Sequence, residues 1–246
     1  MILVRACLCL LLLFSARPAL AQDYEREKRW SDEIVPGLVV GDAVWLEPPQ
    51  GGRKFLGLYT EAHKTRPAVL LVHGLGVHPD HGVIGALRTS LADSGHSTLS
   101  VQMPVLGADA TPKEYQALFP DAVSRITTAA RWLQAKHGGR MVLLSHSMGS
   151  SMSGVYYEQA ADAPFAAWVC MGLGGGFGNM RNVKVPVLDV FGDADLPSVL
   201  RGEWRRRITV DSIPGSRQLK LSKADHFYSG REKPLAAAIV EFIAPR

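Results

Sequence analysis

The stretch MVLLSHSMGSS, residues 141–151, decides the expected fold of this chain. Its first four residues are apolar and predict a buried β-strand, and residues 150–159 predict a helix. Ser147 then stands on the sharp turn between strand and helix, which is the arrangement of a nucleophile elbow. That turn needs small residues two positions either side of the serine; Gly149 meets this need fully and Ser145 less well. A serine that only caps the helix is the alternative interpretation.

Strands and helices alternate on both sides of this stretch. A continuous apolar run, typical of a strand buried on both faces, occurs at residues 68–72, and we expect similar buried strands at residues 98–101, 167–171 and 185–191. Amphipathic or capped helical patterns occur at residues 83–94, 111–118, 121–136 and 234–243. Residues 42–47 and 54–60 predict an initial hairpin, and residues 218–221 a last strand. The expected fold class is α/β: one domain over residues 22–246, with a mostly parallel sheet of about eight strands and helices on both faces.

Two side chains beyond other predicted strands could act together with Ser147. His226 follows the strand at 218–221 and is the candidate base, although a histidine in a surface loop is the simpler interpretation in isolation. Asp193 and Asp195 both follow the strand at 185–191. We expect Asp195 to orient the histidine, because it lies farther beyond the strand, at the sheet edge where ligands bind. Asp193 is the alternative acid and could instead cap the turn.

The loop after the strand at 68–72 reads HGLG and is the candidate oxyanion loop. Backbone N–H groups of Leu75 and Met148 are the expected donors to a developing oxyanion. We expect His73 to brace this loop rather than act as a base. His78 and His81 suggest a metal, but no further ligand cluster accompanies them, so a polar turn is the better account.

These motifs together resemble the α/β-hydrolase superfamily from about Ala68 to the C-terminus. The matching stretches are VLLVHGLG, LLSHSMGSS, VLDVFGDAD and ADHF, and the order Ser…Asp…His is that of the superfamily. More narrowly, the chain is similar to an uncharacterised group of exported bacterial proteins of this fold. The resemblance implies two-step acyl transfer on a small-molecule acyl substrate, with a Ser147–His226–Asp195 triad and without metal or organic cofactor.

The first 21 residues have the pattern of a secretory signal peptide. Arg5 precedes a short apolar run, and Ala19 and Ala21 form a small-residue cleavage site. The run is far shorter than the ~20 residues that span a bilayer, so we expect no transmembrane anchor after cleavage, and a periplasmic or secreted protein. Cleavage removes Cys7 and Cys9 and leaves Cys170 as the only cysteine, which we expect in the core.

The mature chain has only a small excess of basic residues. The sequence has 27 basic and 23 acidic residues, and two of the basic residues belong to the signal peptide. The remaining excess is too small and too scattered to predict nucleic-acid binding. Two dense charged segments stand out: residues 22–31 predict an exposed lead-in of one or two helical turns, and Arg205–Arg207 predict a solvated helix face.

The segment after the strand at 167–171 is short and rich in glycine, where many relatives insert a cap. We therefore expect no large cap domain and an open site, shaped by this loop and by residues 105–120. Esterase-like cleavage of a carboxylic ester or thioester is the leading functional expectation. The rival from another class is a catalytically silent protein of the cell envelope that uses the fold as a binding module, because fold alone does not settle function.

Overall fold

Eight strands form one sheet at the centre of the molecule. The computed structural model describes residues 22–49, 51–62 and 65–244, so the expected signal peptide at 1–21 lies outside the described residues. The order across the sheet is β1-β2-β4-β3-β5-β6-β7-β8. The strands are β1 (Asp42–Leu46), β2 (Phe55–Thr60), β3 (Ala68–Val72), β4 (Thr98–Val101), β5 (Met141–His146), β6 (Ala167–Met171), β7 (Val187–Ala194) and β8 (Arg217–Asp225).

The strand directions follow from the sequence pattern. Strand β2 runs antiparallel to both β1 and β4, as expected for the alternating hairpin at the start of the chain. All other neighbouring strands run parallel. Parallel neighbours need long crossover connections, and here these contain helices. The carboxyl ends of β5, β7 and β8 therefore meet at one edge of the sheet, where the candidate site residues follow them.

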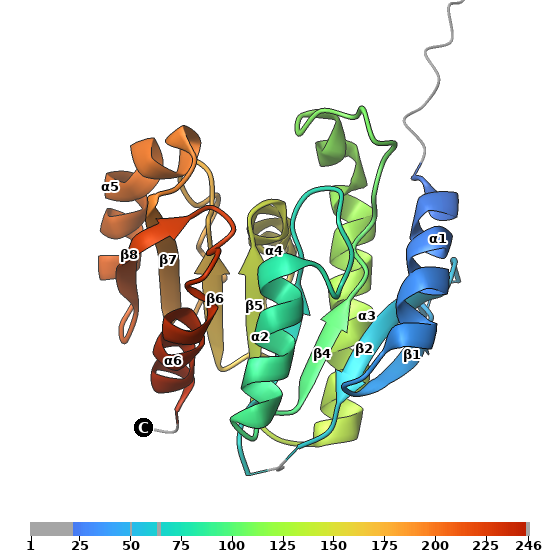
Figure 1. Cartoon of the computed structure of the whole chain (residues 1–246). Helices are drawn as coiled ribbons and strands as arrows, with labels where there is room; N and C mark the ends of the chain where they lie inside the picture. The colour runs from blue at the N-terminus through green and yellow to red at the C-terminus, as the bar shows by residue number, and fades with distance from the viewer. Residues whose placement is uncertain (1–21, 50, 63–64, 245–246) are drawn as a thin grey trace, which may run out of the picture.

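Helices cover both faces of the sheet. One face carries α2 (Gly82–Asp93) and α6 (Glu232–Ile243), whose apolar side chains join the core that contains Leu71 and Val190. The other face carries α3 (Phe119–His137) and α4 (Met148–Gln159) over the core that contains Leu70 and Cys170. Figure 1 shows α2 and α6 in front of the sheet and α3 behind it. The predicted α/β class is confirmed, and so is the placement of Cys170 in the core.

The connection between β6 and β7 contains no helix or strand within the described chain. This connection therefore holds no large cap domain, as predicted. Before α3, the predicted short helix is a 3-10 helix, η2 (Glu114–Leu118). No helix among the described residues is both long enough and apolar enough to cross a membrane.

The prediction that the two charged segments are solvated is only partly right. Residues 24–31 belong to an eleven-residue helix, α1 (Tyr24–Ile34), with a short 3-10 turn after it at Val35–Gly37. Helix α1 docks on the body through Glu27, which lies 2.9 Å from the buried Arg125 of α3. In α5 (Pro197–Asp211), Arg205 and Arg207 are exposed, but Arg206 is completely buried. The physical reason is the same in both helices: one face packs on the protein, so neighbouring charges have opposite environments.

Candidate active site

Ser147 occupies the turn between β5 and α4 with an unusual backbone. Its φ is 55° and its ψ is −121°, a conformation that non-glycine residues rarely adopt and that marks a strained functional turn. Helix α4 approaches β3 so closely that a Cβ at Gly149 would overlap the carbonyl oxygens of Val72 and His73. The small residue two positions after the serine is thus required by packing.

Ser145 fills the other small position of the elbow without distorting it. It is fully buried in β5, and its Oγ accepts a hydrogen bond of 2.9 Å from Nε1 of Trp168 on β6. Its carbonyl oxygen accepts a bond of 3.0 Å from the hydroxyl of Ser150. The hydroxyl that a glycine would lack therefore satisfies the buried indole N–H, which would otherwise lose a partner on leaving water.

The structure brings Ser147, His226 and Asp195 together in one chain of hydrogen bonds. The Oγ of Ser147 lies 2.8 Å from Nε2 of His226, and Nδ1 of His226 lies 2.6 Å from Oδ1 of Asp195. An ionised carboxylate accepts the Nδ1–H, so Nε2 is left to accept the serine proton. These distances are within the reach required of a nucleophile, a base and the group that orients the base.

The two candidate acids have different environments. Asp195 lies just beyond β7, and its carboxylate also accepts N–H bonds from Leu196 at 2.7 Å and Gly192 at 3.2 Å. Asp193 lies within β7, is exposed, and accepts the N–H of Ala224 at 3.3 Å. Burial alone would raise the pKa of Asp195, but its bonds to His226 and to the two backbone N–H groups hold the pKa below the usual value. Of the two, Asp195 is therefore the carboxylate paired with His226 in its ionised form.

His146, which the sequence analysis did not single out, supports His226 from behind. Its ring is 5.0 Å from the ring of His226, and its Nε2 lies 2.9 Å from the carbonyl oxygen of His226. Burial, with a smaller contribution from the nearby His226, lowers the pKa of His146 to about 4. A neutral ring donates Nε2–H to that carbonyl and fixes the backbone of the candidate base. The signal was available: position 146 is the last residue of the buried strand β5 and directly precedes Ser147.

Leu75 and Met148 lie on the two segments that flank Ser147. Met148 is the first residue of α4, so its N–H has no acceptor within the helix. Within the part of the chain that the structure describes, the N–H of Leu75 has no hydrogen-bond acceptor. Gly74 allows this loop to approach Ser147, because a Cβ there would lie 3.2 Å from Cβ of Ser147. His73 braces the loop: its Nδ1 lies 2.9 Å from the Gly74 oxygen, and its Nε2 accepts the Met103 N–H at 2.9 Å.

The histidine-rich turn before α2 shows no arrangement for a metal. His78 and His81 contact each other through their rings at 5.3 Å, and Asp80 pairs with Arg88 at 2.6 Å. Across the described residues, no group of three or more His, Cys, Asp or Glu side chains is placed to hold a metal ion.

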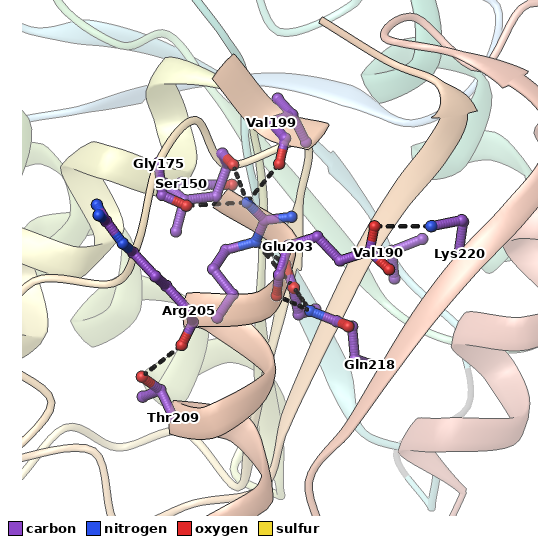
Figure 2. Close-up of polar contacts among 12 residues, drawn as sticks. Ser150, Gly175, Val190, Val199, Glu203, Arg205, Thr209, Gln218 and Lys220 are labelled. Carbon is purple, nitrogen blue, oxygen red and sulfur yellow. Dashed lines mark hydrogen bonds and ion pairs between the residues drawn. The ribbon is translucent and has the colours of Figure 1, made fainter. Parts of the chain in front are cut away.

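A second set of polar residues lies behind the site, around Arg206. Its guanidinium pairs with Asp189 of β7 at 2.9 Å, and both side chains are completely buried. One guanidinium nitrogen also donates to the carbonyl oxygens of Leu173, Gly175 and Val199, each at 2.9 Å. Figure 2 shows Gly175, Val199 and Gln218 around this cluster. The glycine-rich loop that follows β6 is thereby fixed to α5.

This loop touches the candidate base. A Cβ at Gly172, whose φ is +60°, would lie 3.0 Å from Cε1 of His226. Sequence reasoning missed Arg206, although the buried residues of α5 follow the helical period: Val199, Gly202, Arg206 and Val210.

Comparisons with known proteins identify the fold. A family model described as a protein of unknown function (DUF3530) matches residues 25–137, less than half of the chain. No curated protein matches the sequence. A putative α/β hydrolase of unknown function from Agrobacterium tumefaciens superposes with a TM-score of 0.64 at 16% identity, covering 83% of this chain and 99% of that chain.

Two further solved structures give the same result. Dienelactone hydrolase from Anabaena variabilis has a TM-score of 0.63 at 19% identity, covering 81% of this chain and 94% of that chain. An α/β serine hydrolase without lid from Xanthomonas campestris has a TM-score of 0.60 at 16% identity, with 83% and 94% covered. At such identities the likeness concerns the fold, and it agrees with the strand order and the absence of a large cap. The chain has the α/β-hydrolase fold.

Proposed function

We propose that this protein is a serine hydrolase that cleaves a carboxylic ester or thioester. The observation that carries the proposal is the chain of hydrogen bonds from Ser147 through His226 to Asp195, at 2.8 and 2.6 Å. Known enzymes of the same fold support it: one structural neighbour is named a dienelactone hydrolase and another a serine hydrolase without lid.

The reaction would proceed in two halves. The Oγ of Ser147 attacks the carbonyl carbon as its proton passes to Nε2 of His226, and the oxyanion receives hydrogen bonds from the N–H groups of Leu75 and Met148. The bond from the carbonyl carbon to the leaving oxygen or sulfur then breaks, and His226 protonates the leaving group. Water repeats the sequence on the acyl-enzyme and releases the acid and free Ser147. Asp195 holds the tautomer and stabilises the transient imidazolium.

A fluorophosphonate probe tests the nucleophile directly. The probe should label the wild type at Ser147, and Ser147→Ala should lose the label, whereas the matched surface change Ser212→Ala should keep it. A wild type that takes no label would instead favour the catalytically silent binding module of the cell envelope.

The acid is tested by two matched substitutions. We expect Asp195→Asn to lower kcat by about 10⁴-fold, because the amide imposes the wrong tautomer on His226. Asp193→Asn should change kcat by no more than about twofold, since its carboxylate contacts the backbone N–H of Ala224 in β8 and not His226. A larger loss at Asp193 would overturn the assignment of the acid.

Export is part of the same proposal. The sequence of residues 1–21 supports it, and the measurement is the mass of the protein recovered from the periplasm or medium of an expressing bacterium. We expect a chain that begins at Gln22. A protein that stays in the cytoplasm with Met1 attached would contradict export and leave the hydrolase proposal untouched.

A further inference from the structure

Two pockets adjoin Ser147 and His226. Both are lined by Ser147, His226, Leu75 and Leu196. The first, here named the α2 pocket, has a volume of about 250 Å³ and continues over Val77, His81, Val83, Ile84 and Phe227. The second, here named the α5 pocket, has a volume of about 260 Å³ and continues over Pro112, Met148, Ser151, Gly172, Gly174, Ser198 and Val199. A substrate whose carbonyl meets Ser147 can extend one group into each pocket.

The α2 pocket is lined mainly by aliphatic and aromatic side chains. Val77, Val83 and Ile84 form its wall, and Phe227, which is 61% exposed, stands at its rim. The only polar side chains in its lining are those of His81, His146, Ser147 and His226, and no Lys, Arg, Asp or Glu is among the described residues that line it. The two histidines beside the nucleophile are already engaged, His226 with Asp195 and His146 with the His226 carbonyl. Apart from the exposed imidazole of His81, the described wall therefore offers apolar contact and no partner for a charge.

The size of the α2 pocket limits the group that it can accept. A cavity of about 150 Å³ in a protein core can hold one benzene molecule, with six carbon atoms. By proportion, 250 Å³ accommodates a chain or ring system of about eight to ten carbon atoms. Acetyl would leave most of this apolar surface uncovered.

The lining also discriminates against charge. A carboxylate placed in an apolar site without a partner loses its hydration, at a cost of several kcal/mol. Among the described residues that line the α5 pocket, His226 is the one ionisable side chain, and the hydroxyls of Ser151 and Ser198 can meet polar substrate atoms there. No described lysine or arginine lines either pocket, so a charged group on either side of the scissile bond would lack a permanent cation as its partner.

We infer that the substrate is an uncharged ester or thioester whose larger apolar group, of about eight to ten carbon atoms, occupies the α2 pocket. The inference rests on the proposed function and adds the substrate class and the place of its apolar group. The smaller or more polar side of the bond then lies in the α5 pocket.

The experiment measures kcat/KM for two graded series of neutral esters. One series consists of p-nitrophenyl acetate, butyrate, hexanoate, octanoate and dodecanoate, and the other consists of alkyl acetates of the same chain lengths. In one series kcat/KM should rise by up to about fourfold for each added methylene, the worth of a buried CH₂, and level off at about eight to ten carbons. The p-nitrophenyl monoester of suberic acid, which matches octanoate in length but ends in a carboxylate, should be at least about 100-fold worse.

Variants of Val83 locate the group. Val83→Phe fills the α2 pocket and should lower the octanoate-to-acetate ratio of kcat/KM about tenfold, whereas Val83→Ala enlarges the pocket and should move the optimum to a longer chain. Thr89→Phe is the matched control, because Thr89 lies on the same helix and lines neither pocket. Circular dichroism checks that each variant is folded.

The outcomes separate this inference from the proposed function. A protein that is labelled at Ser147 but shows flat profiles in both series, or accepts the suberate ester as readily as octanoate, overturns the inference alone. The inference is also overturned if Thr89→Phe loses the long-chain preference while Val83→Phe keeps it. If Ser147 takes no label, the proposed function fails, and calorimetry on Ser147→Ala still tests the pocket: octanamide should bind more tightly than octanoate.

Discussion

Helices α1 and α5 carry the two most densely charged segments that the structure describes. In each helix, one arginine donates hydrogen bonds to backbone carbonyl oxygens in loops of the candidate site. At one end of the sheet, Arg26 of α1 donates to the carbonyl oxygens of Gly76 at 3.0 Å and Leu106 at 2.9 Å. At the other end, Arg206 of α5 donates to the carbonyl oxygens of Leu173 and Gly175 in the loop after β6. Each arginine ties together backbone segments that the sheet alone does not hold.

The two arginines differ in how completely they are removed from water. Arg206 has no exposed surface and is paired with Asp189, also fully buried. Arg26 is half-buried, lies 4.7 Å from the ring of Trp30, and has its described polar contacts with two backbone oxygens. A buried charge whose partner is removed is far more costly than a half-solvated one. We therefore expect Arg206 to stabilise the fold and Arg26 to set the position of a loop.

The first prediction concerns Arg206→Met, for which we expect the largest effect. Burial raises the pKa of Asp189 in spite of the opposing charge of Arg206. Removing the arginine therefore leaves a carboxylate in a site that does not favour its charge, at an expected cost of about 3–5 kcal/mol in the free energy of unfolding. Urea denaturation measures this cost. The exposed neighbours provide the controls: Arg205→Met and Arg207→Met should each cost less than about 0.5 kcal/mol.

The double variant Arg206→Met with Asp189→Leu sharpens this result. Replacing both members of a buried ion pair by apolar residues is often neutral or stabilising. We expect the double variant to recover most of the lost free energy of unfolding. If it is no more stable than Arg206→Met, the carbonyl oxygens of the loop, and not the Asp189 carboxylate, account for the loss.

The second prediction concerns the pH dependence of stability, to which buried histidines outside the Arg206–Asp189 pair contribute. From α1, contacts run through Glu27 and Arg125 to Gln102, whose Nε2 lies 3.2 Å from Nε2 of His73. Burial lowers the pKa of His73 to about 3. Near Arg206, by contrast, no histidine is among the described hydrogen-bond partners of the Arg206–Asp189 pair.

The sign of the pH effect follows from the unfolded chain. An unfolded histidine takes up a proton below about pH 6.5, whereas His73 and His146 stay neutral in the fold until about pH 3 and 4. The free energy of unfolding should therefore fall as the pH drops from about 6.5 towards 4, by up to about 1.4 kcal/mol per pH unit for each histidine. Urea denaturation at pH 7, 6 and 5 measures the slope. His73→Asn should make it shallower, and a slope of zero in the wild type would contradict the burial of both rings.

The sequence predicted the frame of the fold because its signals are local. Buried strands such as 68–72 appear as continuous apolar runs, and the elbow at Ser147 needs only a strand, a small residue and a helix in succession. The eight-stranded α/β fold and the absence of a large cap were predicted in this way and are confirmed. The roles of Ser147, His226 and Asp195 remain predictions, now with a geometry that allows them.

What the sequence did not show depends on contacts between distant segments. The choice between Asp193 and Asp195 requires knowing that β7 extends to Ala194, three residues beyond its predicted end, so that only the second carboxylate turns towards His226. The interior position of Arg206 could have been found from the helical period of α5. The docking of α1 could not, because Arg26 binds carbonyl oxygens 50 and 80 residues away, and such acceptors have no sequence signature.

The third prediction concerns Arg26→Gln, and its effect should appear in catalysis rather than in stability. Gly76 directly follows Leu75, so losing the guanidinium frees the end of the loop that carries the expected oxyanion donor. Complete loss of one such donor lowers kcat by about 10²–10³-fold, and we expect displacement to cost about tenfold. KM should stay within about twofold, and the free energy of unfolding within about 1 kcal/mol, because Arg26 is half-solvated.

Steady-state kinetics and the affinity for an alkyl boronic acid measure this effect together. The tetrahedral boron adduct of Ser147 places an oxygen where the oxyanion would form, so its affinity should fall in parallel with kcat. Arg26→Lys should recover part of the loss, and Arg29→Gln, exposed on the same helix, is the matched control. An Arg26→Gln protein that is destabilised by several kcal/mol, yet keeps its kcat and boronate affinity, would remove the distinction between the two helices: both arginines would then serve only the fold.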